Sequence, residues 1–151
     1  MSEQNPIRLY VSHTFAEDPD YRRVFEYLES MHNFFYVNCS NIASIPSAGG
    51  KEALKEELRT QIKMAEVVII PSIMYESQRD WITYQMDAAQ AMNLPIVALE
   101  PFGGTQIMPK EVAERADERV EWNERLIVDA LRRQARHEET TRWETIEFEL
   151  P

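Results

Sequence analysis

The feature that most limits the fold of this chain is a regular alternation of short apolar runs with segments of helical periodicity. This alternation is typical of a parallel sheet wrapped by helices, because each helix returns the chain to the start of the next strand. We therefore predict an α/β fold with an open, doubly wound parallel sheet of about five strands in the order 2-1-3-4-5. The predicted strands are residues 7–12, 34–37, 67–70, 96–99 and 119–122.

The helices between these strands are predicted from apolar residues at spacings of three and four. Asn123 is expected to cap the last helix, and Pro109 to open a short helix after a glycine-containing loop. The residues expected to face the core are Tyr21, Val24, Phe25, Leu28 and Met31 in the first helix; Leu54, Leu58 and Ile62 in the second; Trp81, Gln85, Ala88 and Met92 in the third; and Leu126, Ile127, Ala130 and Leu131 in the last.

Length and pattern indicate one domain, residues 1–136, followed by a tail, residues 137–151. In the tail, Ile146, Phe148 and Leu150 alternate with two glutamates, which is a strand pattern. Such a strand can pair with an edge of this sheet, pair with another chain in a homo-oligomer, or stay mobile.

Charge and cysteine content argue against several classes of function. A formal net charge of −10 disfavours a surface that tracks nucleic-acid phosphates. No apolar run approaches the roughly 20 residues of a membrane span, and residues 1–10 lack a secretory pattern, so we expect a cytoplasmic protein. The single cysteine, Cys39, excludes an internal disulfide, and the three histidines show no ligand spacing, so no metal site is predicted.

Gln85 interrupts the apolar stripe of the third predicted helix. A buried amide must find hydrogen-bond partners or cost roughly 1–3 kcal/mol. It therefore belongs either to a structural network or to a polar cleft.

The fold type itself predicts where a ligand site lies. In open doubly wound sheets, ligands bind beyond the carboxyl ends of the strands where the strand order reverses, here between the first and third strands. Gln85 is close enough in the chain to face this crevice. The side chains that follow the first three strands are Ser12, His13, Thr14 and Phe15; Asn38, Ser40 and Asn41; and Ser72, Met74, Tyr75 and Ser77.

Several nucleotide and phosphoryl chemistries of this fold type lack their residues here. A phospho-receiver domain needs acidic residues after the first strand and an aspartate at the end of the third, and neither is present. A flavin-phosphate loop needs small residues that wrap a phosphate, but the segment SHTFAED contains no glycine. The GxGxxG fingerprint and the P-loop are also absent.

Four segments, in this order and spacing, carry a resemblance to a known family: VSH, PSIMYESQRDWITYQMDAA, PIVALEPFGG and RVEWNERLIVDALR. Together they resemble the Thoeris-type TIR-like proteins over residues 7–133. The resemblance implies a TIR-like, flavodoxin-related fold and a role in bacterial anti-phage defence. It also implies that catalytic members cleave the nicotinamide bond of NAD, as hydrolases or cyclases. The product is an ADP-ribose-derived signalling molecule that activates a separate effector protein.

The chain departs from the family's catalytic pattern at one position. In that pattern a tryptophan, here Trp81, is followed four residues later by the essential glutamate, and this position matches Gln85. A carboxylate stabilises the positive charge that develops on the ribose, whereas an amide does not, and its loss costs on the order of 10²-fold or more in rate. Three explanations of this departure are open. Gln85 can hold a substrate without turnover, or another acid (Asp87, Glu76 or Asp80) can take the role of the glutamate. The third is that the domain is a binding module.

We therefore predict a TIR-like defence protein that recognises NAD or a related nucleotide and, if active, cleaves it without a further cofactor. The alternatives are a catalytically weak or inactive adaptor that acts through protein–protein contacts, and a nucleoside deoxyribosyltransferase-like enzyme, against which Gln85 also counts. In the favoured interpretation Gln85 holds the catalytic position, and the binding residues are Ser12, His13, Thr14, Phe15, Ser72, Tyr75 and Trp81.

Overall fold

The computed structural model, which describes residues 3–138, has a parallel sheet of five strands in this part of the chain. The strand order is β2-β1-β3-β4-β5, and every neighbouring pair is parallel. The predicted α/β class and strand order are therefore confirmed. The strands are β1 (Ile7–Val11), β2 (Tyr36–Asn38), β3 (Val67–Pro71), β4 (Ile96–Leu99) and β5 (Glu118–Val120). The helices are α1 (Pro19–Glu29), α2 (Gly50–Lys63), α3 (Met74–Ser77), α4 (Arg79–Ala91), α5 (Lys110–Arg115) and α6 (Glu124–Arg136).

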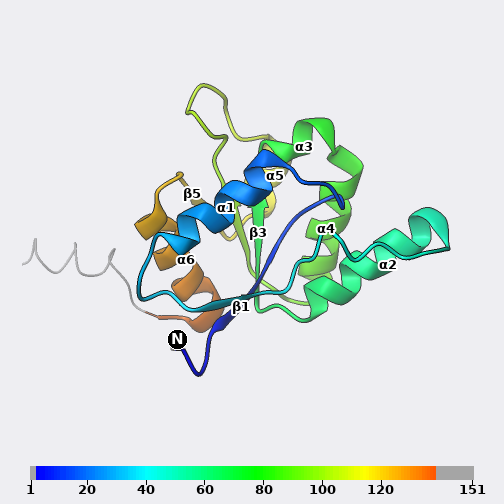
Figure 1. Cartoon of the computed structure of the whole chain (residues 1–151). Coiled ribbons are helices and arrows are strands. Elements are labelled where there is room, and N and C mark those ends of the chain that lie inside the picture. Colours follow the sequence, from blue (N-terminus) through cyan, green and yellow to red (C-terminus); the bar gives the residue numbers. More distant parts are fainter. Residues whose placement is uncertain (1–2, 139–151) are drawn as a thin grey trace, which may run out of the picture.

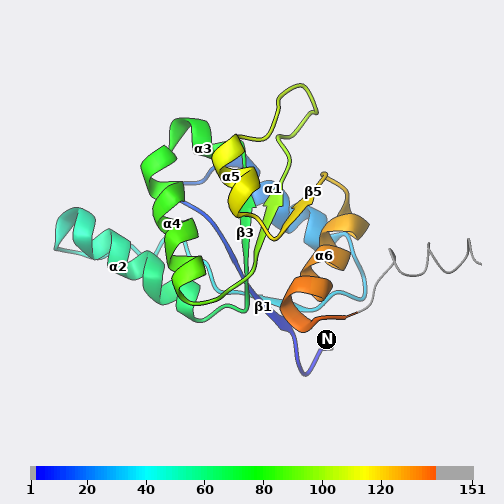
Figure 2. The ribbon, with the colours of Figure 1, turned by 180° about the vertical axis from the view of Figure 1, so that it is seen from behind.

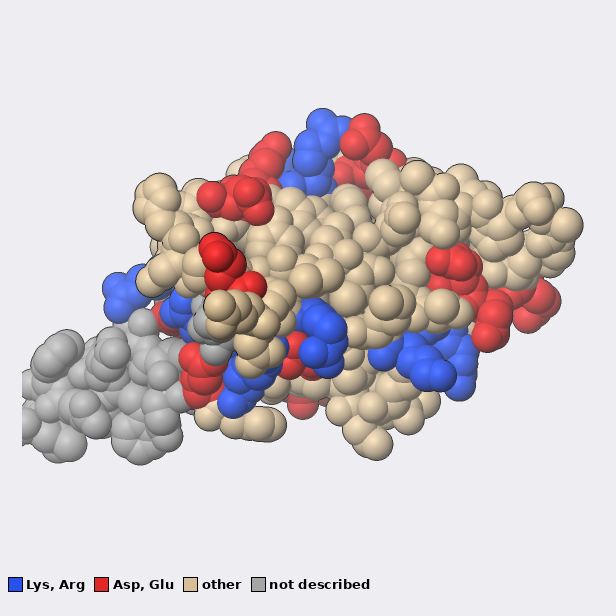
Figure 3. All heavy atoms as spheres, turned by 60° about the horizontal axis from the view of Figure 1, so that its bottom comes forward, with Lys and Arg blue, Asp and Glu red and all other residues tan. Residues whose placement is uncertain are grey.

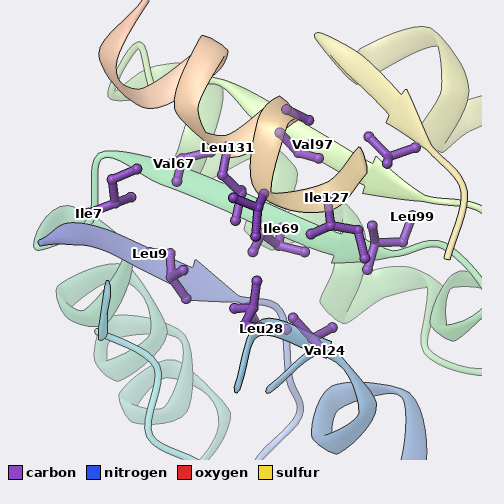
Figure 4. Close-up of a cluster of buried hydrophobic side chains, with 14 of the residues drawn as sticks. Ile7, Leu9, Val24, Leu28, Val67, Ile69, Val97, Leu99, Ile127 and Leu131 are labelled. Atoms are coloured by element: carbon purple, nitrogen blue, oxygen red, sulfur yellow. The ribbon is translucent and has the colours of Figure 1, made fainter. Parts of the chain in front are cut away.

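Helices cover both faces of the sheet (Figures 1 and 2). On one face, α1 and α6 bury Val24, Leu28, Ile127 and Leu131 against alternate residues of β1, β3 and β4 (Figure 4). On the other face, α2, α4 and α5 pack against the intervening residues of the same strands. All five residues of β3 are buried, as expected for a central strand of a parallel sheet.

Local signals explain where two of the helices begin. Asp18 caps α1 by accepting a hydrogen bond from the Asp20 amide at 2.8 Å, and Pro19 follows it. The predicted cap of α6 is confirmed, because Asn123 Oδ1 accepts from the Leu126 amide at 2.9 Å. Each cap uses an amide that has no partner within its helix.

Some predicted positions were wrong in detail. The buried face of α4 is Ile82, Gln85, Met86, Ala88 and Ala89, while Trp81 and Met92 are only half-buried. The predicted face, which includes Trp81, and the observed face, which includes Ile82, both contain Gln85 and Ala88. Packing against both α2 and the sheet selects the face that includes Ile82.

Two further predictions were displaced by one or two residues. Leu126 is 43% exposed, and the buried arc of α6 runs instead through Ile127, Val128, Ala130 and Leu131. The second strand begins at Tyr36 rather than at residue 34, because Phe34 enters the core from the loop before this short edge strand.

Residues 139–151 lie outside the described part of the chain, so the strand predicted from Ile146, Phe148 and Leu150 stays a prediction. Within residues 3–138, no helix has both the length and the apolar character needed to cross a bilayer. Within the same range, no cluster of three or more His, Cys, Asp or Glu side chains could hold a metal ion. On the face shown in Figure 3, Lys and Arg side chains lie in separate groups with acidic side chains between them.

Candidate functional site

Gln85 lies on the inner side of α4 with no exposed surface, and every hydrogen-bonding position of its amide is used. Its Oε1 accepts from the Tyr10 hydroxyl and from the His13 backbone amide, the latter at 3.1 Å. Its Nε2 donates to the carbonyl of His13 at 2.9 Å and to the carbonyl of Trp81 at 3.1 Å. The side chain therefore ties α4 to the end of β1.

These contacts favour an amide over a carboxylate at position 85. Nε2 is held between two backbone carbonyl oxygens, and a glutamate would place an oxygen acceptor against both of them. The charge of that carboxylate would also be fully desolvated, which raises a carboxyl pKa and destabilises the ionised form.

His13 is held as a neutral imidazole with a defined tautomer. Its Nδ1 accepts from the Phe15 amide at 3.0 Å, so the proton lies on Nε2, which donates to Gln61 Oε1 at 2.8 Å. Burial lowers the pKa of His13, and the hydrogen bond to Gln61 and the charge of Glu57 only partly oppose this effect. The turn places Phe15 at φ 62°, a left-handed conformation that is uncommon for a bulky residue.

Gln61 on α2 extends this arrangement to the loop after β2. Its Oε1 also accepts from the Asn41 amide at 2.9 Å, and its Nε2 donates to the Asn41 carbonyl at 3.1 Å and to Glu57 Oε2 at 2.9 Å. We call Tyr10, His13, Gln61 and Gln85 the buried amide network. It joins β1, α2 and α4 at the carboxyl end of the sheet, where the ligand crevice was predicted.

Sequence reasoning missed two members of this network. Gln61 follows Leu58 by three positions and precedes Ile62, so it is a polar residue on an apolar face, which is the signal that identified Gln85. Tyr10 gave no such signal, because a tyrosine in an apolar strand looks like an ordinary core residue.

The other predicted site residues differ in their access to solvent. Ser12 and Ser72 are fully buried and Tyr75 is nearly so, whereas Thr14, Phe15 and Trp81 are half-buried. The Ser72 hydroxyl donates to the Leu99 carbonyl at 2.6 Å. Ser12 Oγ has no hydrogen-bond partner among the described residues. Of these six residues, only Thr14, Phe15 and Trp81 therefore present appreciable surface to a ligand from outside.

Two cations lie close to aromatic members of the predicted site. The Lys51 ammonium is 5.9 Å from the centre of the Trp81 ring, and the Arg79 guanidinium is 5.2 Å from that of Tyr75. These cations could meet the phosphates of a nucleotide that approached the half-buried residues.

The three alternative acids are solvent-exposed. Asp87 forms an ion pair with Arg115, and Glu76 and Asp80 are exposed residues in the first turns of α3 and α4. The carboxylate that contacts the buried amide network is Glu57, which is bonded to Gln61 rather than directed toward Gln85.

Comparison with known protein families assigns the chain to one of them. A family model described as "Thoeris protein ThsB, TIR-like domain" matches residues 10–106, which is more than half of the chain. No curated protein matches. The matched region includes the last two residues of β1, all of β2 to β4, and the whole buried amide network. The chain therefore belongs to the Thoeris ThsB TIR-like domain family.

Proposed function

We propose that this TIR-like defence protein acts by binding and contact, without appreciable cleavage of NAD. The observation that carries the proposal is the complete use of the Gln85 amide by Tyr10, His13 and Trp81. A group that assists cleavage of a glycosidic bond must reach the ribose, but Gln85 has no exposed surface and no unused lone pair or N–H group.

The chemistry of the amide points in the same direction. Loss of the nicotinamide leaves positive charge on the ribose, which a nearby carboxylate stabilises in a partly desolvated site. Gln85 supplies only a dipole, and its oxygen is already directed toward two donors. The hydrogen bonds of Gln85 therefore hold α4 against the end of β1.

A second function, recognition and cleavage of NAD as the substrate, is favoured by the half-buried aromatic residues. Phe15 and Trp81 can stack on a base, and Lys51 lies beside Trp81. In this alternative the segment after β1 moves, NAD enters, and an ADP-ribose-derived messenger reaches an effector protein.

Nicotinamide release by wild type and Gln85→Glu distinguishes the two functions. We assay each purified protein with NAD, alone and with infected-cell extract in case a trigger is needed. The control is Gln90→Glu, an exposed change on the same helix that keeps the acceptor for Arg115. The contact function predicts background release from all three proteins. The enzymatic function predicts release that rises in Gln85→Glu, and a robust wild-type rate would contradict the contact function.

Thermal and urea unfolding of the same variants test whether the hydrogen bonds of Gln85 stabilise the fold. Gln85→Glu exchanges two donated hydrogen bonds for repulsion and buries a carboxylate, so we expect a loss of about 2–4 kcal/mol of unfolding free energy near pH 7.5. Gln90→Glu should change it by less than about 0.5 kcal/mol. Equal stability of Gln85→Glu and wild type would mean that these contacts are not maintained in solution.

A further inference from the structure

A groove of about 500 Å³ lies at the carboxyl ends of β4 and β5, away from the buried amide network. Its walls come from α1, from the segment after β5, and from the loop after β4, which projects beyond the sheet (Figures 1 and 2). The residues that matter here are Tyr27, Glu100, Phe102, Glu121 and Trp122.

The three aromatic rings of this groove hold one another edge to face. The Trp122 ring centre is 5.2 Å from that of Tyr27, at 72°, and 5.7 Å from that of Phe102, at 81°. The indole N–H of Trp122 donates to the Glu100 carbonyl at 2.6 Å, which fixes the ring. Phe102 remains 42% exposed. The groove therefore presents pre-positioned π surface to solvent.

This aromatic cluster already binds one guanidinium. The Arg23 guanidinium lies 3.8 Å from the centre of the Phe102 ring and 5.8 Å from that of Trp122, and it forms an ion pair with Asp20. Such geometry is that of a cation–π contact. The cluster therefore has the electrostatics to bind an arginine side chain, and the 42% exposure of Phe102 is surface that remains with Arg23 in place.

The charges around the groove favour a second cation. Two carboxylates, Glu100 and Glu121, line it. Arg23, the cation on the Phe102 ring, already has an acidic partner in Asp20. Glu100 accepts from Arg119 at 3.3 Å, while Glu121 has no ion pair within the described part of the chain. The net charge of −10 adds long-range attraction for a basic partner and repels a phosphate-bearing one.

We propose that this groove docks an arginine-bearing segment of a partner protein, with the guanidinium on the aromatic surface that Arg23 leaves exposed and beside Glu121. The proposal deepens the contact function and rests on it for its biological meaning. Its test is independent, however, because peptide binding can fail while the NAD assay still supports the contact function.

The test is titration of the full chain, labelled for two-dimensional NMR, with the peptide acetyl-Gly-Arg-Gly-Arg-Gly-amide. The control peptide carries citrulline in place of arginine, which keeps the shape and removes the charge. We expect shift changes centred on Phe102, Glu121 and Trp122, binding at least tenfold weaker for the citrulline peptide, and weakening by added salt. Equal binding of both peptides, or shift changes elsewhere, would overturn the proposal, as would no shift change at millimolar peptide.

Two variants separate the cation site from general electrostatics. Glu121→Gln should weaken arginine-peptide binding about two- to fivefold, and Phe102→Leu, which removes the π face but keeps apolar bulk, should do so by a similar factor. Glu111→Gln on α5 makes the same change in net charge at an exposed position outside the groove and should have little effect. Equal effects of Glu121→Gln and Glu111→Gln would count against the proposal. Binding of inorganic phosphate in the groove would also overturn it.

Discussion

At the scale of single residues, two glutamines and a histidine determine how the carboxyl end of the sheet is closed. Each glutamine bridges segments far apart in the sequence, with 75 residues separating Tyr10 from Gln85 and 48 separating His13 from Gln61. Gln85 could be predicted because a polar residue on an apolar helix face must be satisfied. Its partners could not, since the pattern of one helix does not specify which backbone groups of a distant strand will meet it.

The buried histidine makes stability depend on pH in a predictable direction. Burial lowers the pKa of His13, so between its folded value and the ordinary value of 6.5 the unfolded chain binds more protons than the folded one. The stabilisation is therefore complete above the unfolded pKa and is lost as pH falls through the folded pKa. Protonation of Nδ1 would also break the bond from the Phe15 amide.

Urea unfolding at about pH 7.5 and about pH 5.5 measures this effect, with a slope of at most about 1.4 kcal/mol per pH unit from one group. We expect the unfolding free energy of His13→Gln to decrease less between these two pH values than that of the wild type, because the variant lacks the titrating imidazole. His32→Gln, at an exposed position, is the matched control and should retain the wild-type decrease. An unchanged pH dependence in His13→Gln would contradict the assignment.

At the scale of elements, β4 was predicted to the residue and the sheet order in full, because short apolar runs that alternate with helical patterns leave few alternatives. The rotation of α4 about its axis was not predictable. Its two apolar stripes overlap, and the contacts with α2 and the sheet that choose between them are tertiary. Phe34 shows the same limit, since it is buried without belonging to a strand.

The start of α2 depends on a glycine for a reason that can be tested. Gly49 has φ 103°, and a Cβ there would lie 2.6 Å from the Cβ of Ala53. We expect Gly50→Ala, at φ 58° with open space around it, to cost about 1 kcal/mol of backbone strain. Gly49→Ala should cost at least about 1 kcal/mol more, because it adds the clash. Equal unfolding free energies for the two variants in urea would show that α2 shifts to relieve the contact.

At the scale of the whole molecule, the carboxyl edge of the sheet has two regions of opposite character. Near β1 and β3, the buried amide network lies at the end of the sheet where ligands bind in related architectures, and its amide groups are bonded to one another and to the backbone. Beyond β4 and β5, an acidic aromatic groove stays open. This division is consistent with a family member that works through contact.

The tail itself is expected to bury Ile146, Phe148 and Leu150, each worth roughly 1.5–3 kcal/mol before the entropy of ordering is subtracted. Truncation after Glu138 removes it and keeps the end of α6, where the His137 amide donates to the Arg133 carbonyl at 2.8 Å. We expect a lower melting temperature if the tail pairs with its own sheet, or a smaller sedimenting species if it pairs with another chain. Replacing Ile146, Phe148 and Leu150 by serine should reproduce the effect at full length. No change in either measurement would show that the alternating pattern is not used.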